Sequence, residues 1–269
     1  MRIFAIISLP RNVFPGTTSK TCVLLGVKGK HEGSVLMAKI ERLSDLSNFE
    51  KIAKPVNLEG DVLYPEFYIE RISLKTDLRL GDVVDVRSGA TEYGKRRILS
   101  DSGIPFISAK VVTDLGLDFS RDRRFVPPGS VMDKKRARVE VGDVLFVRVG
   151  VGCIGRTAVV TDESEKGVAD DWLYILRVKD GRVSPYYVAF YLQTETIQKE
   201  IRRLARGVGT ITIPKSCLQN LPFVFDERLN EIAKDVYLKM LELRKAGRIT
   251  EAQVLRRRFL KMLDDKIRS

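Results

Sequence analysis

A glycine-rich segment is the first candidate for cofactor chemistry. Residues 150–155 read Gly-Val-Gly-Cys-Ile-Gly and follow an apolar run at residues 144–149, and this spacing matches a dinucleotide-binding turn. Such a turn opens a helix whose N-terminus meets the pyrophosphate. Here residues 156–161 are rich in β-branched side chains and indicate another strand. The pattern therefore favours a tight turn between two strands, and no bound cofactor is expected.

Two adjacent carboxylates are the second candidate. Asp170 and Asp171 precede Trp172 and an apolar run, and paired carboxylates serve metal binding and acid-base catalysis. Neighbouring residues of a strand point to opposite faces, however, so the two are not expected to share one ion or one proton. We interpret them as part of a turn at a strand edge.

Histidine and cysteine usage narrows the chemistry further. His31 is the single histidine, and Cys22, Cys153 and Cys217 are widely spaced. This composition argues against a zinc site, a disulfide framework and a histidine-dependent nucleophile. The sequence therefore predicts no metal site, no catalytic residues and no enzymatic activity.

Basic residues offer a different chemistry. The chain has 47 Lys and Arg against 35 Asp and Glu, which gives a formal net charge of +12. Such an excess favours polyanionic partners, namely nucleic acid or an anionic membrane surface. No stretch approaches the roughly 20 apolar residues that span a bilayer, and residues 1–10 lack the cleavage site of a signal peptide. A cytoplasmic location is expected.

Three basic clusters fall in segments that the pattern places in loops. Residues 95–97 follow Tyr93-Gly94, a second pair flanks the glycine turn at Arg148 and Arg156, and a third group surrounds residues 207–210. Arg148 and Arg156 could extend from adjacent strand ends toward one surface. Each cluster alone is typical of a solvated surface. Together they favour a polyanion-binding face, because loops on a rigid scaffold commonly deliver base and phosphate contacts.

Residues 1–78 contain none of these three basic clusters. Two β-rich runs at residues 3–9 and 21–27 are separated by turn residues and predict a strand pair. A helix is expected over residues 36–52, with Asp45 or Ser47 as its cap. Residues 53–78 are expected to form a connection with little core of its own.

From Leu80 the pattern changes to a β-rich domain. A helix is expected from the cap at Ser184, with Pro185 in its first turn, to Arg203. The expected strands cover residues 83–86, 105–107, 144–149, 157–160, 173–178 and 210–213.

The chain ends in two expected helices. Asp226 is a plausible cap for the first, Gly247 ends it, and Thr250 can cap the second. Apolar residues spaced by three and four form a stripe on the first helix that needs a surface to pack on. A partner helix would provide one.

Read in order, residues 80–225 resemble the target recognition domain of type I restriction-modification specificity subunits. The matching segments are Leu-Gly-Asp-Val-Val-Asp-Val-Arg-Ser-Gly at 80–89, Gly-Ile-Pro-Phe-Ile at 103–107, Val-Gly-Asp-Val-Leu-Phe-Val-Arg-Val-Gly at 141–150, Ile-Gly-Arg at 154–156, Ser-Pro-Tyr-Tyr at 184–187 and residues 207–222. The resemblance implies that this domain reads part of a double-stranded DNA site. It also implies that the following helices set spacing and dock methyltransferase subunits, with a restriction subunit as a further possible partner.

One departure from the family pattern bears on assembly. The usual subunit has two recognition domains and two helical spacers, whereas this chain has one of each. The resemblance therefore implies a half-subunit that forms a homodimer through residues 226–269 to read an interrupted site.

The N-terminal segment resembles a second family. Residues 6–14 and 20–25 are similar to the last strands of an adenine-N6 DNA methyltransferase, and residues 63–68 to the linker of fused enzymes. The Asn-Pro-Pro-Tyr or Asn-Pro-Pro-Phe motif and the glycine-rich S-adenosylmethionine loop of that family are missing from this sequence. Two alternatives to a specificity component stay open: the C-terminal part of a fused methyltransferase, and a protein–protein assembly adaptor.

The expected architecture is α+β. Residues 1–78 form a methyltransferase-like strand pair with a helix and a linker, residues 79–225 a β-rich recognition domain with packed helices, and residues 226–269 a helical hairpin or coiled-coil-like spacer. The residues expected to contact DNA are Arg87, Ser88, Lys95, Arg96, Arg97, Lys110, Arg148, Arg156, Arg206, Thr210 and Lys215.

Overall fold

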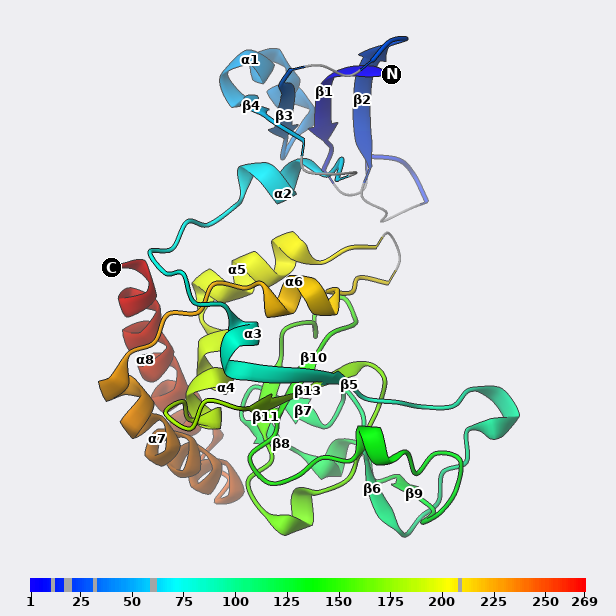
Figure 1. Ribbon diagram of the computed structural model, residues 1–269, viewed down its shortest axis with the longest axis vertical. Coiled ribbons are helices and arrows are strands. Elements are labelled where there is room, and N and C mark those ends of the chain that lie inside the picture. Colours follow the sequence, from blue (N-terminus) through cyan, green and yellow to red (C-terminus); the bar gives the residue numbers. More distant parts are fainter. Residues whose placement is uncertain (11–12, 17–20, 31–32, 59–61, 208–209) are drawn as a thin grey trace. The chain divides into compact units, whose positions relative to one another are not determined.

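The computed structural model describes residues 1–10, 13–16, 21–30, 33–58, 62–207 and 210–269. His31 and Lys20 lie outside these residues. The chain divides into two compact units, one formed by Met1–Ser73 and the other running from Leu74 to Ser269 apart from residues 207–209. Figure 1 labels the elements of both.

The first unit is built on a four-stranded sheet of order β2-β1-β3-β4. Its strands are β1 (Arg2–Ser8), β2 (Cys22–Val27), β3 (Val35–Lys39) and β4 (Lys54–Val56). β1 runs antiparallel to β2 and parallel to β3. The strand pair expected near residues 3–9 and 21–27 is confirmed.

The expectation of a helix over residues 36–52 is wrong for most of that segment. Val35 and Met37 are fully buried whereas Leu36 is 40% exposed, so the side chains alternate as in a strand. Only the 3-10 turn η1 (Leu43–Asn48) and helix α1 (Phe49–Ile52) are helical. Arg42 occupies the cap position of η1, with its backbone N–H bonded to the Asp45 carboxylate, and Asn48 that of α1, so the expectation that Asp45 or Ser47 would be the cap is wrong.

Residues 53–78 also contribute more core than expected. Helix α2 (Pro65–Ile69) places Tyr68 and Ile69 against the buried side chains of Ile3, Val35 and Met37. Tyr68 and Ile69 therefore pack on the core of the first unit.

The second unit contains a central antiparallel sheet of order β11-β10-β13-β5. Its strands are β5 (Val84–Ser88), β10 (Val144–Val147), β11 (Thr157–Val159) and β13 (Leu173–Val178). Leu145, Val147 and Ile175 belong to a buried cluster with Val111 and Val139. A strand follows the glycine turn, as expected.

A smaller sheet of order β12-β6-β9 adjoins it and contains β6 (Ile104–Ile107), β9 (Phe125–Val126) and β12 (Val168–Ala169). Short elements complete this β-rich part: the hairpin β7 (Val112–Thr113) and β8 (Gly116–Leu117), helices α3 (Leu80–Val83) and α6 (Lys215–Gln219), and the 3-10 turns η2 (Gly94–Arg96), η3 (Phe119–Arg121), η4 (Lys135–Ala137) and η5 (Glu163–Glu165). The expected strand at residues 210–213 is reduced to bridges from Thr212 to Val149 and Arg206, since Pro214 and α6 end the run.

The helix expected from Ser184 to Arg203 is broken in two. Ser184 caps α4 (Pro185–Gln193) by accepting from the backbone N–H of Tyr186. Thr194 then adopts an extended conformation, and its hydroxyl donates to the carbonyl oxygen of Tyr191 at 2.8 Å. This side-chain bond competes with the helical one, so a new helix, α5 (Glu195–Leu204), begins at the next residue.

The C-terminal helices α7 (Glu227–Lys245) and α8 (Ile249–Arg268) form a hairpin. Asp226 caps α7 as expected, by accepting from the N–H of Leu229 at 3.0 Å. Gly247 adopts a φ of 75° between the helices. Arg248 occupies the cap position of α8, so the expectation that Thr250 would cap it is wrong.

The apolar stripe of α7 packs within the chain. The buried ring of Tyr237 lies 5.5 Å from that of Phe190 in α4, which is itself 4.7 Å from Phe259 in α8. Figure 1 shows α7 and α8 beside α4. The helical pair is therefore part of the second compact unit, and its stripe does not need a partner helix to be covered. The fold is α+β, as expected, and no described helix has the length and apolarity to cross a bilayer.

The hydroxyl of Tyr237 accepts a hydrogen bond from the buried backbone N–H of Val159 at 2.9 Å. Tyr237→Phe should lower the free energy of unfolding by about 1–3 kcal/mol, because it leaves that N–H without an acceptor. Tyr186→Phe is the matched control, since the Tyr186 ring packs at 5.3 Å on the same side chain. Equal unfolding free energies of the two variants in urea titrations would contradict this account.

Candidate nucleic-acid interface

The loop after β5 leaves the sheet through a close backbone contact. The N–H of Gly89 donates to the carbonyl of Leu173, and the N–H of Ala90 to that of Ala169. A Cβ atom at Gly89 would lie 2.0 Å from the carbonyl oxygen of Asp170. Only glycine therefore fits where residues 89–98, the basic loop, begin.

Gly89→Ala should consequently lower the free energy of unfolding by about 1–3 kcal/mol or more, because the added methyl group must displace backbone. Gly181→Ala is the control, since a Cβ there meets no atom within 4 Å. The check is chemical denaturation of both variants. If the Gly89 variant is as stable as the control, the basic loop is not fixed at this contact.

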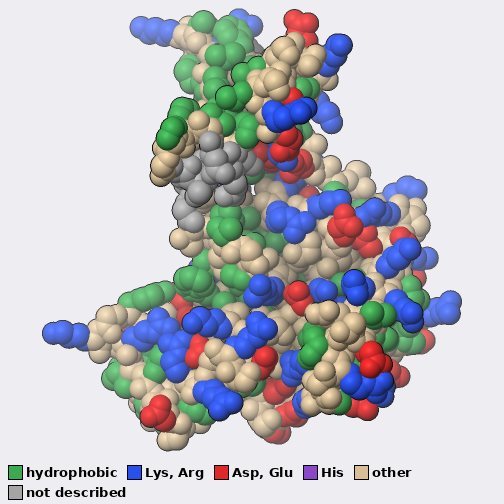
Figure 2. Space-filling view, turned by 180° about the vertical axis from the view of Figure 1, so that it is seen from behind, with side chains coloured by type: hydrophobic (Ala, Val, Ile, Leu, Met, Phe, Trp, Pro, Cys, Tyr) green, Lys and Arg blue, Asp and Glu red, His purple; other side chains and the backbone are tan. Residues whose placement is uncertain are grey.

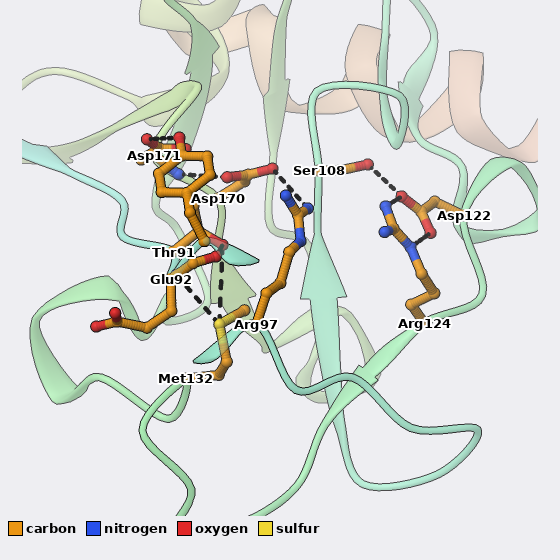
Figure 3. A network of polar contacts seen from close by, with 10 residues as sticks. Thr91, Glu92, Arg97, Ser108, Asp122, Arg124, Met132, Asp170 and Asp171 are labelled. Carbon is orange, nitrogen blue, oxygen red and sulfur yellow. Dashed lines mark hydrogen bonds and ion pairs between the residues drawn. The ribbon is translucent and has the colours of Figure 1, made fainter. Parts of the chain in front are cut away.

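A pair of carboxyl groups lies beneath the basic loop (Figure 3). Asp170 is 7% exposed, and the Tyr93 hydroxyl donates to Asp171 Oδ2 at 2.5 Å. Burial, together with the neighbouring Asp171 carboxyl group, raises the pKa of Asp170 to about 7. The backbone N–H of Asp171 donates to Asp170 Oδ1 at 2.7 Å, so the two residues are neighbours in one turn, as interpreted from the sequence. They lie in a turn before β13, where strand alternation does not hold.

Ion pairs fix the rest of the basic loop. Arg97 points toward Asp170, with Nη2 3.9 Å from its Oδ2. The Glu92 carboxylate pairs with Lys134 and also lies 3.4 Å from Arg96, and these cations keep its pKa below the ordinary value. The loop is therefore tied to two neighbouring segments of the second unit.

A second ion pair stands beside this network. Arg124 holds Asp122 in a two-point contact at 2.6 and 2.5 Å, and the Ser108 hydroxyl donates to the same carboxylate at 2.6 Å. The guanidinium groups of Arg97 and Arg124 both lie over the Phe106 ring, at 5.6 and 5.3 Å. Arg124 thereby neutralises the buried carboxylate of Asp122.

Other basic side chains around the basic loop are exposed to solvent. Lys95 and Lys110 are exposed, and so are three residues of segment 121–138 that the sequence reasoning missed: Arg123, Lys135 and Arg136. None of the five side chains makes a hydrogen bond or ion pair with another described residue. Figure 2 shows Lys and Arg side chains across one face of the second unit, with fewer acidic ones between them. The runs Arg-Asp-Arg-Arg and Lys-Lys-Arg were the available sequence signal.

Arg148 and Arg156 are not brought together. The Arg148 guanidinium lies 5.1 Å from the Tyr174 ring and donates to its hydroxyl at 3.2 Å. Arg156 instead lines a cavity with Gln198 and Arg256. The backbone of Val147 bonds to that of Arg156, so Arg148, one residue on, belongs to the opposite face of the sheet.

The remaining candidates occupy two further positions. Arg87 lies 3.8 Å from the buried carboxylate of Asp143, which Arg177 already binds at two points. Ser88 ends the same strand and is exposed. Arg206, Thr210 and Lys215 are exposed around the bridge between Arg206 and Thr212.

Similarity to known proteins is found among solved structures. No family model matches the sequence, and no curated protein has a significantly similar sequence. The chain is similar to solved structures from type I restriction-modification systems. One is a structure from a study of the complex assembly and conformational transition of the type I R-M system. It has 22% sequence identity and a TM-score of 0.43, and the match covers 71% of this chain and 45% of that one.

Two others are crystal structures of single subunits. The HsdS subunit from Thermoanaerobacter tengcongensis has 21% identity and a TM-score of 0.41 over 71% of this chain and 44% of that one. The S subunit of the Type-I restriction-modification system from M. genitalium has 14% identity and a TM-score of 0.42 over 66% and 44%. This chain spans less than half the length of each. The methyltransferase resemblance of the N-terminal segment stays a prediction.

Proposed function

We propose that this chain binds double-stranded DNA through the basic loop and its neighbours, and selects the sequence at which other chains act. The observation that carries this proposal is that acidic side chains near the basic loop are paired while several exposed cations are not. The carboxylates of Asp122 and Glu92 are paired with Arg124 and Lys134, whereas the exposed ammonium groups of Lys95 and Lys110 make no hydrogen bond or ion pair with a described residue. Free ammonium and guanidinium groups are what a phosphate backbone recruits.

The rigidity of the basic loop supports sequence reading in particular. Base recognition needs side chains held in a fixed register with the groove, while phosphate contacts set position. The glycine contact at Gly89, the Tyr93 hydrogen bond and the ion pair of Arg97 fix the loop at three points. A loop anchored in this way can discriminate between base edges at low entropic cost.

The partners follow from the sequence resemblance. We assign this chain no catalytic step of its own, and we propose that a methyltransferase and an endonuclease subunit supply the chemistry in the cytoplasm. Homodimerisation through residues 226–269 stays part of the proposal. It is supported by large apolar side chains of the hairpin that remain at least 38% exposed, namely Ile232, Leu238, Ile249 and Met262.

Fluorescence-anisotropy titration of labelled duplex DNA at several salt concentrations tests the proposal. We expect the logarithm of the association constant to fall linearly with the logarithm of salt concentration, by about 0.9 for each phosphate contacted. Binding that is insensitive to salt, or no binding to any duplex, would contradict it.

A further inference from the structure

A cationic cavity of about 280 Å³ lies in the second unit, and none of its lining residues belongs to the basic loop. Three arginines from three different elements line it: Arg156 after the glycine turn, Arg202 of α5 and Arg256 of α8. The other polar side chains of the lining are Gln193, Gln198 and Asp114. The volume is just below the range of about 300–1,000 Å³ typical of sites for larger ligands, so it suits a small one.

The charges around this cavity do not balance. Asp114 is the one carboxylate among its lining residues, and its Oδ1 lies 3.9 Å from Arg256 Nη2. Arg156 donates to the carbonyl oxygen of Gly152 at 3.2 Å, which is a neutral partner. The exposed Arg202 side chain makes no hydrogen bond or ion pair with another described residue, and its charge attracts that of Glu195 in the same helix. Three guanidinium groups therefore meet a single, partly exposed carboxylate.

Arg256 is held in place by neutral groups. Its side chain is 18% exposed, and its Nε donates to Gln193 Oε1 at 2.7 Å. The amide nitrogen of Gln193 donates to Thr157, which fixes the amide with its oxygen toward the arginine. Burial lowers the pKa of Arg256, and Asp114 opposes this shift. A cation that has lost much of its hydration gains strongly from a close anion.

We propose that this cavity binds a phosphate group. Guanidinium groups match phosphate oxygens in two-point contacts, and three of them from separate elements can surround a tetrahedral anion in a way that a planar carboxylate does not use. The group can come from free phosphate or from the backbone of DNA, and the chemistry at the arginines is the same. Only the DNA source rests on the proposed function.

Isothermal titration of the full chain with inorganic phosphate, against sodium chloride of equal ionic strength, tests the free anion. Arg202→Gln should weaken binding at least tenfold. Arg258→Gln, an exposed position of α8 outside the cavity, should leave it unchanged. Because the exposed Arg202 side chain loses only an electrostatic attraction to Glu195, the variant should fold as the wild type does, and thermal unfolding verifies this.

Titration of the same three proteins with labelled duplex DNA identifies the source. If backbone phosphate fills the cavity, Arg202→Gln weakens DNA binding more than Arg258→Gln does, although both remove one charge. If free phosphate is the ligand, the phosphate isotherm depends on Arg202 and the two variants bind DNA alike. Phosphate binding without any DNA binding would contradict the proposed function alone. No saturable phosphate binding, together with equal DNA affinities of the two variants, would overturn the cavity assignment.

Discussion

Asp170→Asn is expected to be more stable than the wild-type protein above neutral pH, with the difference shrinking toward acid pH. The pKa of Asp170 rises from an ordinary 3.8 to about 7 on folding. Between these values the folded state keeps a proton that the unfolded state has lost, so wild-type stability falls as pH rises. The shift corresponds to about 4 kcal/mol once both states are ionised. An asparagine side chain has nearly the same shape as the protonated carboxyl group, its oxygen can accept from the Asp171 N–H, and it does not ionise.

Urea denaturation of both proteins at about pH 4.5 and pH 8 measures this difference. Trp172 is the only tryptophan and lies next to the carboxyl pair, so its fluorescence reports on the second unit. Asp101→Asn, at an exposed position, should follow the wild type at both values. Parallel pH dependence of wild type and Asp170→Asn would show that folding does not raise the pKa of Asp170.

The largest expected effect on binding comes from removing three outward basic side chains together. The triple variant Lys95→Ala, Lys110→Ala, Arg123→Ala should bind duplex DNA with a salt dependence reduced by about 2.7 in log–log slope, if each side chain contacts one phosphate. Its affinity near 0.1 M salt should fall by orders of magnitude. Folding should be unaffected, because none of the three side chains makes a hydrogen bond or ion pair with a described residue, and Lys110 loses only an electrostatic attraction to Asp122.

A charge-matched control separates local contacts from net charge. Lys234→Ala, Arg258→Ala and Lys261→Ala remove three exposed cations from α7 and α8, which the proposal assigns to protein partners. This variant should keep the wild-type slope in the same anisotropy titrations. Equal losses in the two triple variants would mean that DNA binding depends on overall charge and not on the basic loop.

Much of the second unit could be predicted because local patterns and tertiary packing agree there. The strand at Leu173–Val178 and the caps at Ser184 and Asp226 lie where the sequence indicated. The segment around Val35–Lys39 was misread because a short strand beside a helical turn gives mixed spacing, and only pairing with β1 decides it. Thr194 was missed since a single side-chain bond ends its helix.

The candidate interface was less predictable than the fold. Runs of Lys and Arg show where charge is, but not which side chains are already engaged: Arg97 and Arg124 face buried carboxylates, while Lys95 and Arg123 face solvent. The raised pKa of Asp170 depends on burial and on its neighbour Asp171, which no local pattern reveals. The cavity at Arg156 joins residues more than 100 positions apart, and no local pattern indicates that proximity.

Selection of bound duplexes from a random DNA library by the full chain tests the central claim most directly. We expect an enriched consensus sequence, and a consensus in two separated halves if the chain reads DNA as a homodimer. Retention of duplexes without any enrichment would show charge-driven binding only, and would contradict the claim that this chain selects a DNA sequence.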